Sequence, residues 1–334
     1  FPLAGELAIR HRIDIPATLC LLGAMLGWGT APVMLKYLTA HVPDGFTTNL
    51  IRYPIASMVY LPFVVMAARR GDLRGFWLVA LIPASVNVLG QTLWAVAPYY
   101  MAIGSQAFVV RLGVVWGIVA AFVMFPDERQ LLRSPRFWTG AILAMAGVTV
   151  MLIVGSGEAA KVTPIGVSLI LTCGVCYGLY GVGVRFIMGR RNPLIVFGVV
   201  GLYTSVGLVG LAPFGDPKSL LTLGAWPMVI MVLSAFIGIS IAHGLYYIAV
   251  KRIGVAVASL VLTLTPFVSA VESIVWLEEQ FTWLEWVGGG VLTVGAALTV
   301  MSQQRLDPTA GSEGFPVVLE EVEAPSFDAD HDNS

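Results

Sequence analysis

Long apolar runs, separated by short polar segments, occupy most of the chain. A transmembrane helix needs about 20 largely apolar residues to cross about 30 Å of hydrocarbon. Strands of a membrane barrel would instead alternate apolar and polar residues, and stretches such as residues 141–154 show no such alternation. We therefore predict an all-α membrane protein with ten transmembrane helices, at residues 16–38, 46–68, 76–97, 104–125, 137–154, 164–186, 193–212, 225–249, 255–277 and 283–302.

Polar segments flank the apolar region at both ends. Residues 1–15 have no separate apolar stretch of the kind found in a cleaved signal peptide, and we expect them to form a short cytoplasmic segment. Residues 303–334 are acidic and contain several prolines, a composition that cannot bury enough apolar surface to offset the entropy of ordering. We predict that this acidic C-terminal tail is disordered and cytoplasmic.

The composition fits a membrane protein and excludes other classes. Hydrophobic residues make up 57% of the chain and charged residues 12%, whereas about 25% of a typical soluble domain is charged. Positive charges are scattered between the apolar runs rather than gathered on one face, which disfavours a nucleic-acid-binding protein. The three cysteines all lie inside apolar runs, which excludes a secreted disulfide framework.

The positive charges concentrate in alternate connecting segments. If the N-terminus is inside, 14 of the 19 Lys and Arg residues fall in inner segments, and only Lys36, Lys161 and Lys218 fall in outer ones. Cytoplasmic loops of membrane proteins are enriched in Lys and Arg. We therefore expect a multi-pass protein of the cytoplasmic membrane with both termini on the cytoplasmic side.

The two halves of the chain repeat the same features at an offset of about 149 residues. Trp28 in the first predicted helix corresponds to Tyr177 in the sixth, and a glycine follows each of them. Each half contains five predicted helices, an odd number, so the second half enters the membrane in the opposite orientation. We predict an inverted repeat of two five-helix bundles, residues 16–154 and 163–302. Matching glycines occur in the fifth and tenth helices, at positions 140 and 147 and at positions 288 and 295.

Several motifs support this interpretation. The first half contains LGWGTAPVMLK (26–36), Arg52 and YYMAIGSQAF (99–108), and the second contains VCYGLYGVGVR (175–185) and a long matching stretch at 246–298. With these motifs the chain resembles the drug/metabolite transporter superfamily in its ten-helix, EamA-like form. The resemblance implies two five-helix bundles, a substrate path between them, and secondary transport or exchange of a small metabolite.

Three ionisable residues lie inside predicted helices, where each costs about 2.5–3.5 kcal/mol on insertion scales. Arg52, Arg111 and Glu272 fall about 7, 6 and 9 Å from the midpoints of their helices, all in the outer half. An ion pair of Glu272 with either arginine would leave one positive charge, which suits a carboxylate or phosphate of a substrate. The alternative is a structural ion pair beside an arginine that extends to the interface.

Other polar and aromatic residues in the predicted helices each have two possible roles. His243 is a candidate for proton coupling or a packed histidine with a satisfied hydrogen bond. Asn87 and Gln91 share one helix face and either line the substrate path or bond to another helix. Trp28 and Tyr177 are candidate walls of the substrate cavity or members of an interfacial aromatic belt.

The chain lacks the patterns of several other chemistries. Cys173 and Cys176 form a C-x-x-C inside an apolar run without companion ligands, so we predict no metal site. No GxxxxGK[ST] motif is present, so ATP is not the expected driving force. We expect no catalytic residue and no cofactor, because bond-breaking chemistry would need a paired acid and base or a metal cluster.

These observations predict a secondary active transporter that moves a small metabolite by alternating access. The expected substrate is anionic or zwitterionic, such as an amino acid or a related compound. The alternatives are a membrane-embedded enzyme or a scaffold without transport activity, while a channel would need a ring of charge that the sequence lacks. The expected partners are the lipid bilayer and the substrate with a coupling proton, and a homodimer is left open.

Overall fold

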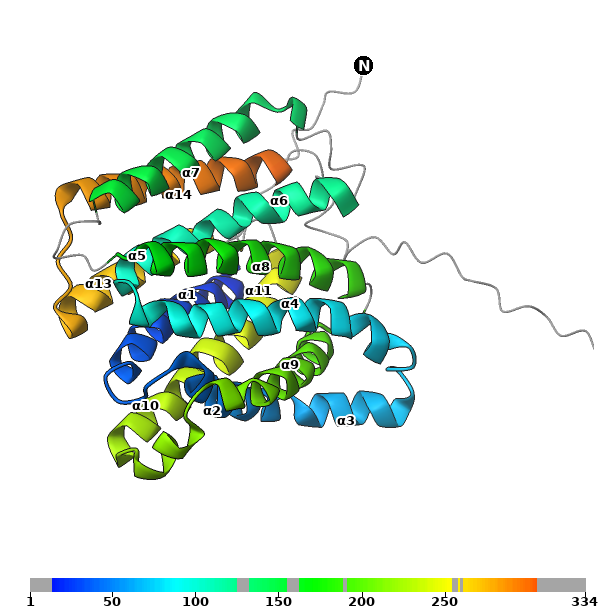
Figure 1. Cartoon of the computed structure of the whole chain (residues 1–334). Coiled ribbons are helices and arrows are strands. Elements are labelled where there is room, and N and C mark those ends of the chain that lie inside the picture. The colour runs from blue at the N-terminus through cyan, green and yellow to red at the C-terminus, as the bar shows by residue number, and fades with distance from the viewer. Residues whose placement is uncertain are drawn as a thin grey trace, which may run out of the picture.

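The computed structural model describes residues 14–124, 132–154, 162–188, 191–253, 258 and 261–304. Within these ranges the chain is helical and contains no strand. The helices form one elongated array in which α7 and α14 lie side by side at one edge (Figure 1). The α-helices are α1 (Ile15–Leu38), α2 (Gly45–Met58), α3 (Leu61–Arg70), α4 (Phe76–Val96), α5 (Ile103–Val109), α6 (Gly113–Met124), α7 (Pro135–Val154), α8 (Pro164–Met188), α9 (Pro193–Gly210), α10 (Ala225–Ala235), α11 (Ala242–Ile253), α13 (Thr265–Leu277) and α14 (Trp283–Gln304).

The prediction of an all-α membrane protein is confirmed. Eight described helical stretches are long and apolar enough to cross a membrane, and the bent pair α2 and α3 is a ninth if it counts as one span. The ninth predicted helix is described only as the shorter α13, because Thr263 and Leu264 form a turn before it and most of residues 254–260 lie outside the described residues. The count of ten therefore stays a prediction. The N-terminal segment up to residue 13 and the acidic tail from residue 305 also lie outside the described residues.

The helix predicted at residues 46–68 is bent in the structure. The structure has α2 and α3 there, which meet at an angle of 53°. Pro62 is the second residue of α3, and a proline lacks an amide hydrogen and clashes with the carbonyl four residues earlier, here that of Met58. The helix therefore breaks just before this proline.

Side-chain caps fix where several helices begin. The Asp14 carboxylate accepts a hydrogen bond from the amide of Ala17 at 3.0 Å, and Asp44 caps α2 in the same way through Thr47. Asp14 also pairs with Arg252 near the end of α11, at 2.9 Å. The Ala17 amide and the Arg252 guanidinium hold the pKa of Asp14 below its usual value. This contact places the start of α1 beside the end of α11.

The repeat appears in space as paired contacts between corresponding helices. In the crossing of α7 and α14, a Cβ added to Gly147 would lie 2.6 Å from the carbonyl oxygen of Gly288, and one added to Gly295 would lie 2.6 Å from that of Gly140. Because these positions correspond at an offset of 148 residues, the two contacts are copies of one contact. A pseudo-twofold axis therefore passes between α7 and α14.

The direction of the helices shows that the repeat is inverted. Lys36 in the last turn of α1 donates to the carbonyl of Met101, and Thr163 just before α8 donates to the carbonyl of Tyr100. The end of α1 and the start of α8 thus lie at the same end of the array. Since α1 and α8 are corresponding helices, they run in opposite directions, and the two-repeat architecture is confirmed.

The two halves differ in regularity. The bent pair of α2 and α3 corresponds to the continuous α9. The continuous α4 corresponds to α10 and α11, which are joined by a π-helical turn, η6 (Phe236–Ile241). The bend and the π turn contact each other, because the Tyr60 hydroxyl donates to the carbonyl of Ser240 at 2.6 Å, and the Ser240 hydroxyl donates to the carbonyl of Ala56 at 3.1 Å. The irregular segments of α2 and η6 are therefore joined to each other.

Candidate functional site

Arg52 is a buried cation without an acidic partner among the described residues. Its side chain lies on α2 and is 2% exposed, and its Nε donates to the Ser234 hydroxyl of α10 at 2.8 Å. Its Nη1 is buried and has no hydrogen-bond partner in the described part of the chain. Burying a guanidinium costs several kcal/mol unless an opposite charge or hydrogen bonds compensate it. This arrangement leaves a donor ready for an anionic ligand.

Asn49 presents a buried acceptor one helical turn from Arg52. Its Nδ2 donates to the carbonyl of Gln91 on α4 at 2.9 Å. Its Oδ1 is buried and has no partner among the described residues. Residues three apart lie on one helix face, so α2 places an unpaired donor and an unpaired acceptor next to each other.

Asn87 and Gln91 belong to a polar network between α2, α4 and α9. The Asn87 amide donates to the Tyr53 hydroxyl and to the Thr204 hydroxyl, both at 3.0 Å. Gln91 donates to the Asn87 side chain at 3.5 Å. Tyr53 directly follows Arg52, so this network fixes the face of α2 beside the arginine.

Tyr177 of α8 lies near the same arginine. It is close enough to interact electrostatically with Arg52, as Tyr53 is. Its ring packs on Trp94 of α4, with ring centroids 6.2 Å apart. The neighbouring Cys173 donates to the carbonyl of Gly90 at 3.3 Å. The structure thus brings four of the predicted site residues, Arg52, Asn87, Gln91 and Tyr177, into one region between α2, α4 and α8.

Trp28 and His243 form a second group. The Trp28 ring meets the His243 ring edge-on at 5.0 Å, and His243 stacks on Phe197 at 4.7 Å. His243 Nδ1 lies 2.7 Å from the carbonyl oxygen of Ile239. A carbonyl only accepts, so Nδ1 carries the proton and Nε2 is the acceptor nitrogen of the neutral ring.

The expected ion pair of Glu272 with an arginine is wrong for the described residues. Glu272 of α13 instead accepts a hydrogen bond from the Thr30 hydroxyl of α1 at 2.8 Å. Arg111 lies in η2 (Val110–Leu112), and its Nε is buried without a hydrogen-bond partner in the described part of the chain. A threonine two residues from Trp28 therefore satisfies Glu272, and neither arginine is neutralised by it.

Several residues of this region were not predicted from the sequence. Ser234 bonds to Arg52, while Tyr53 and Thr204 bond to Asn87. Ser, Thr and Tyr are common in membrane helices, so their identity alone carries no signal. Only the three-residue spacing of Asn49 and Arg52 could have indicated a shared face. No group of three or more His, Cys, Asp or Glu within the described ranges could hold a metal ion.

Comparison with known proteins agrees with the repeat. The profile of the EamA-like transporter family matches residues 15–153 and again residues 164–301. A solved structure described only as the crystal structure of a protein is 20% identical, with a TM-score of 0.60, and the match covers 87% of this chain and 98% of that chain. At this identity the likeness shows the fold alone. No curated protein matches the chain.

The two matched segments are the two halves that the pseudo-twofold axis relates, and together they cover nearly all of the described residues. The resemblance to the drug/metabolite transporter superfamily is therefore confirmed. The chain is a multi-pass membrane protein that belongs to the EamA-like transporter family.

Proposed function

We propose that the protein is a secondary active transporter of a small anionic or zwitterionic metabolite, such as an amino acid or a related compound. Membership of a transporter family supports transport over the alternatives of a membrane-embedded enzyme or a scaffold. The observation that supports an anionic substrate is the buried Arg52, whose Nη1 lacks a partner among the described residues. A substrate carboxylate would supply the missing charge and would accept from the guanidinium in a charge-assisted hydrogen bond.

Asn49 extends this proposal to zwitterions. Its buried Oδ1 accepts hydrogen bonds only, and it lies one turn from Arg52 on α2. An α-amino acid carries a carboxylate and an ammonium two bonds apart. The carboxylate would bind Arg52 and the ammonium would donate to Asn49, with Asn87, Gln91 and Tyr177 shaping the surrounding walls.

The other candidate residues have secondary roles in this proposal. Arg111, whose Nε has no partner among the described residues, is a second positive charge that attracts the anion along its path. Glu272 and Thr30 line that path on the side of α13 and α1. His243 takes up the coupling proton at Nε2, because its Nδ1 is already committed to Ile239. A pH gradient would then drive transport, and His243→Gln would uncouple transport from that gradient.

Alternating access is supported by the burial of the Arg52 side chain and by the irregular helices next to it. Arg52 is almost fully buried, so a substrate reaches it only when helices part. Ser234, its partner, lies two residues before the π turn, and Arg52 lies two turns before the bend of α2. Irregular turns of this kind often mark functional positions in helices. We assign the hinge of the transport cycle to the joined bend and π turn.

The orientation that we propose follows from the loop charges. Both termini face the cytoplasm of the cell membrane, and the segment around Glu158 faces out. Single cysteines introduced at positions 158 and 190 in a cysteine-free protein test this directly. We expect an impermeant thiol reagent added outside to label position 158 and not position 190. Labelling of position 190 alone would reverse the orientation.

Ligand binding to the purified protein in detergent tests the substrate class. We expect compounds with a free carboxylate, or a carboxylate and an ammonium, to raise the melting temperature, and their uncharged amides and esters to have no effect. A ligand at 100 times its Kd stabilises the folded state by about 2.7 kcal/mol, which such a measurement resolves. Stabilisation by neutral or cationic compounds alone would contradict the proposed substrate class.

A further inference from the structure

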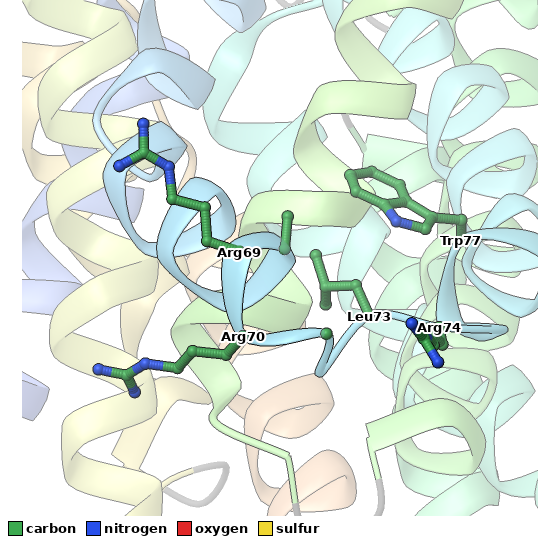
Figure 2. Close-up of a pocket in the computed structure, with 7 residues that line it drawn as sticks. Arg69, Arg70, Leu73, Arg74 and Trp77 are labelled. Atoms are coloured by element: carbon green, nitrogen blue, oxygen red, sulfur yellow. The ribbon is translucent and has the colours of Figure 1, made fainter.

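A second feature with potential for binding lies far from Arg52, at the turn between α3 and α4. A cavity of about 380 Å³ opens there, lined by Ala68, Arg69, Arg70, Leu73, Arg74 and Trp77 together with Gly71. Figure 2 shows Arg69 and Arg70 extending from one side, Arg74 and Trp77 on the other, and Leu73 between them. In this view the side chains of Arg69 and Arg70 point away from Leu73 and Trp77, so these arginines lie at the edge of the cavity with their guanidinium groups turned outward.

The turn is a defined structure, so the arginines start from fixed positions. Gly71 and Gly75 have φ values of 80° and 71°, which a glycine adopts without strain. The amide of Asp72 donates to the carbonyl of Ala67 at 3.1 Å and closes the end of α3. Leu73 and Phe76 are buried and anchor the turn on either side of Arg74.

The charge of the turn is not neutralised by the described residues. Arg69, Arg70 and Arg74 are exposed, and none of the three has an ion pair or hydrogen bond from its side chain among the described residues. Asp72 is the one acid between residues 69 and 77, so the turn carries a net charge of +2. Three exposed arginines at the edge of a cavity suit a phosphate, because their flexible side chains can reach over the cavity and a phosphate accepts hydrogen bonds from several guanidinium groups at once.

The position of the turn indicates where that phosphate comes from. Lys36 at the end of α1 bonds to carbonyls just after α4, so the start of α4 lies at the opposite end of the array, with the start of α1 (Figure 1). On α4, Leu78 and Ile82 follow the cavity and are 74% and 69% exposed. They are four residues apart and share one face, which acyl chains would cover. The half-buried Trp77 lies between the charged and apolar parts, as tryptophan does at membrane interfaces.

We propose that this cavity binds the headgroup of one anionic phospholipid, with its acyl chains along the exposed face of α4. Basic pockets at the cytoplasmic end of membrane helices are suited to such headgroups. The proposal is independent of the transported substrate, because the cavity and Arg52 lie on different parts of the fold. It assigns a function to three arginines that the transport mechanism does not use.

Native mass spectrometry of the purified protein tests this proposal. The probes are phosphatidylglycerol and phosphatidylcholine with identical acyl chains, added at equal concentrations. We expect one phosphatidylglycerol to be retained with about tenfold preference over phosphatidylcholine. The double variant Arg69→Gln/Arg74→Gln should lose this preference. These side chains are exposed, so the variant should fold normally, which size-exclusion chromatography checks.

The matched control is the double variant Arg133→Gln/Arg136→Gln. These two arginines are also exposed and lie outside the cavity, Arg133 two residues before α7 and Arg136 in its first turn. The control should retain phosphatidylglycerol like the unmodified protein. An equal loss in the control, or no preference in the unmodified protein, would overturn the proposal. Displacement of the lipid by millimolar sn-glycerol 1-phosphate would also overturn it, because the site would then bind free phosphates. Lipid binding that occurs only after removal of residues 306–334 would overturn it too, because the acidic tail would then be the occupant of the cavity in the whole protein.

Discussion

Replacing Arg52 with methionine is expected to weaken substrate binding strongly and to abolish transport, while leaving the stability of the protein unchanged or higher. The guanidinium is buried, and its Nη1 has no partner in the described part of the chain. A guanidinium that is buried without an opposite charge has a large desolvation cost, and methionine fills a similar volume without that cost. Removing one partner of a buried charge pair with a ligand costs about 2–5 kcal/mol of binding free energy. The substrate Kd should therefore rise by a factor of about 30 or more.

Two further variants sharpen this prediction. Arg52→Lys keeps the charge but loses the planar fork of donors, so we expect it to recover only part of the binding. Ser302→Ala is the control, because Ser302 is also buried and donates to the carbonyl of Leu298 within α14 at 2.8 Å, outside the proposed site and hinge. It should bind and transport normally. Melting temperature and Kd are measured for all three proteins, and a strong loss of stability in Arg52→Met with intact binding would show that the arginine is structural.

Gly295→Ala is expected to destabilise the fold by about 1–3 kcal/mol, because it adds a methyl group where α7 and α14 are already in backbone contact. The new Cβ would lie 2.6 Å from the carbonyl oxygen of Gly140 on α7. Backbone atoms cannot rotate away, so the two helices must separate. Gly147→Ala should have a similar effect, since it makes the corresponding contact with Gly288. The melting temperature in detergent reports both changes.

Gly290→Ala provides the control on the same helix. A Cβ at this position meets no atom within 4 Å. Alanine is favoured over glycine in a helix by about 0.5–1 kcal/mol, so this variant should be as stable as the original or slightly more stable. If Gly290→Ala and Gly295→Ala had the same melting temperature, the close crossing of α7 and α14 would be incorrect.

The helices and the repeat were predictable from the sequence for a simple physical reason. Lipid requires long uninterrupted apolar segments, and the boundaries predicted for most helices agree with the structure within two or three residues, as in α1 and α4. The duplication was also predictable, because corresponding glycines at 147 and 295 must remain small where two copies of one helix cross. These features depend on residues that are close in sequence or repeated in it.

The bend of α2 and the partners of the charged residues were harder to predict. Pro54 and Pro62 both lie in the second apolar run, and only the second one breaks the helix, because η6 supplies bonds to the freed groups through Ser240. Depth in the membrane correctly suggested that Glu272 needs a partner. The depth alone does not identify whether the partner is an arginine or Thr30, because the partner depends on which helices pack together and how they are rotated about their axes.

Counterflow in proteoliposomes tests the central proposal, anion transport at Arg52, most directly. Vesicles are loaded with an unlabelled carboxylate or amino acid that stabilises the protein in detergent, and the labelled compound is added outside. We expect the label to accumulate transiently in vesicles with the unmodified protein and with Ser302→Ala, and not in vesicles with Arg52→Met. Equal accumulation with Arg52→Met, or accumulation of only neutral or cationic compounds by the unmodified protein, would contradict the proposal.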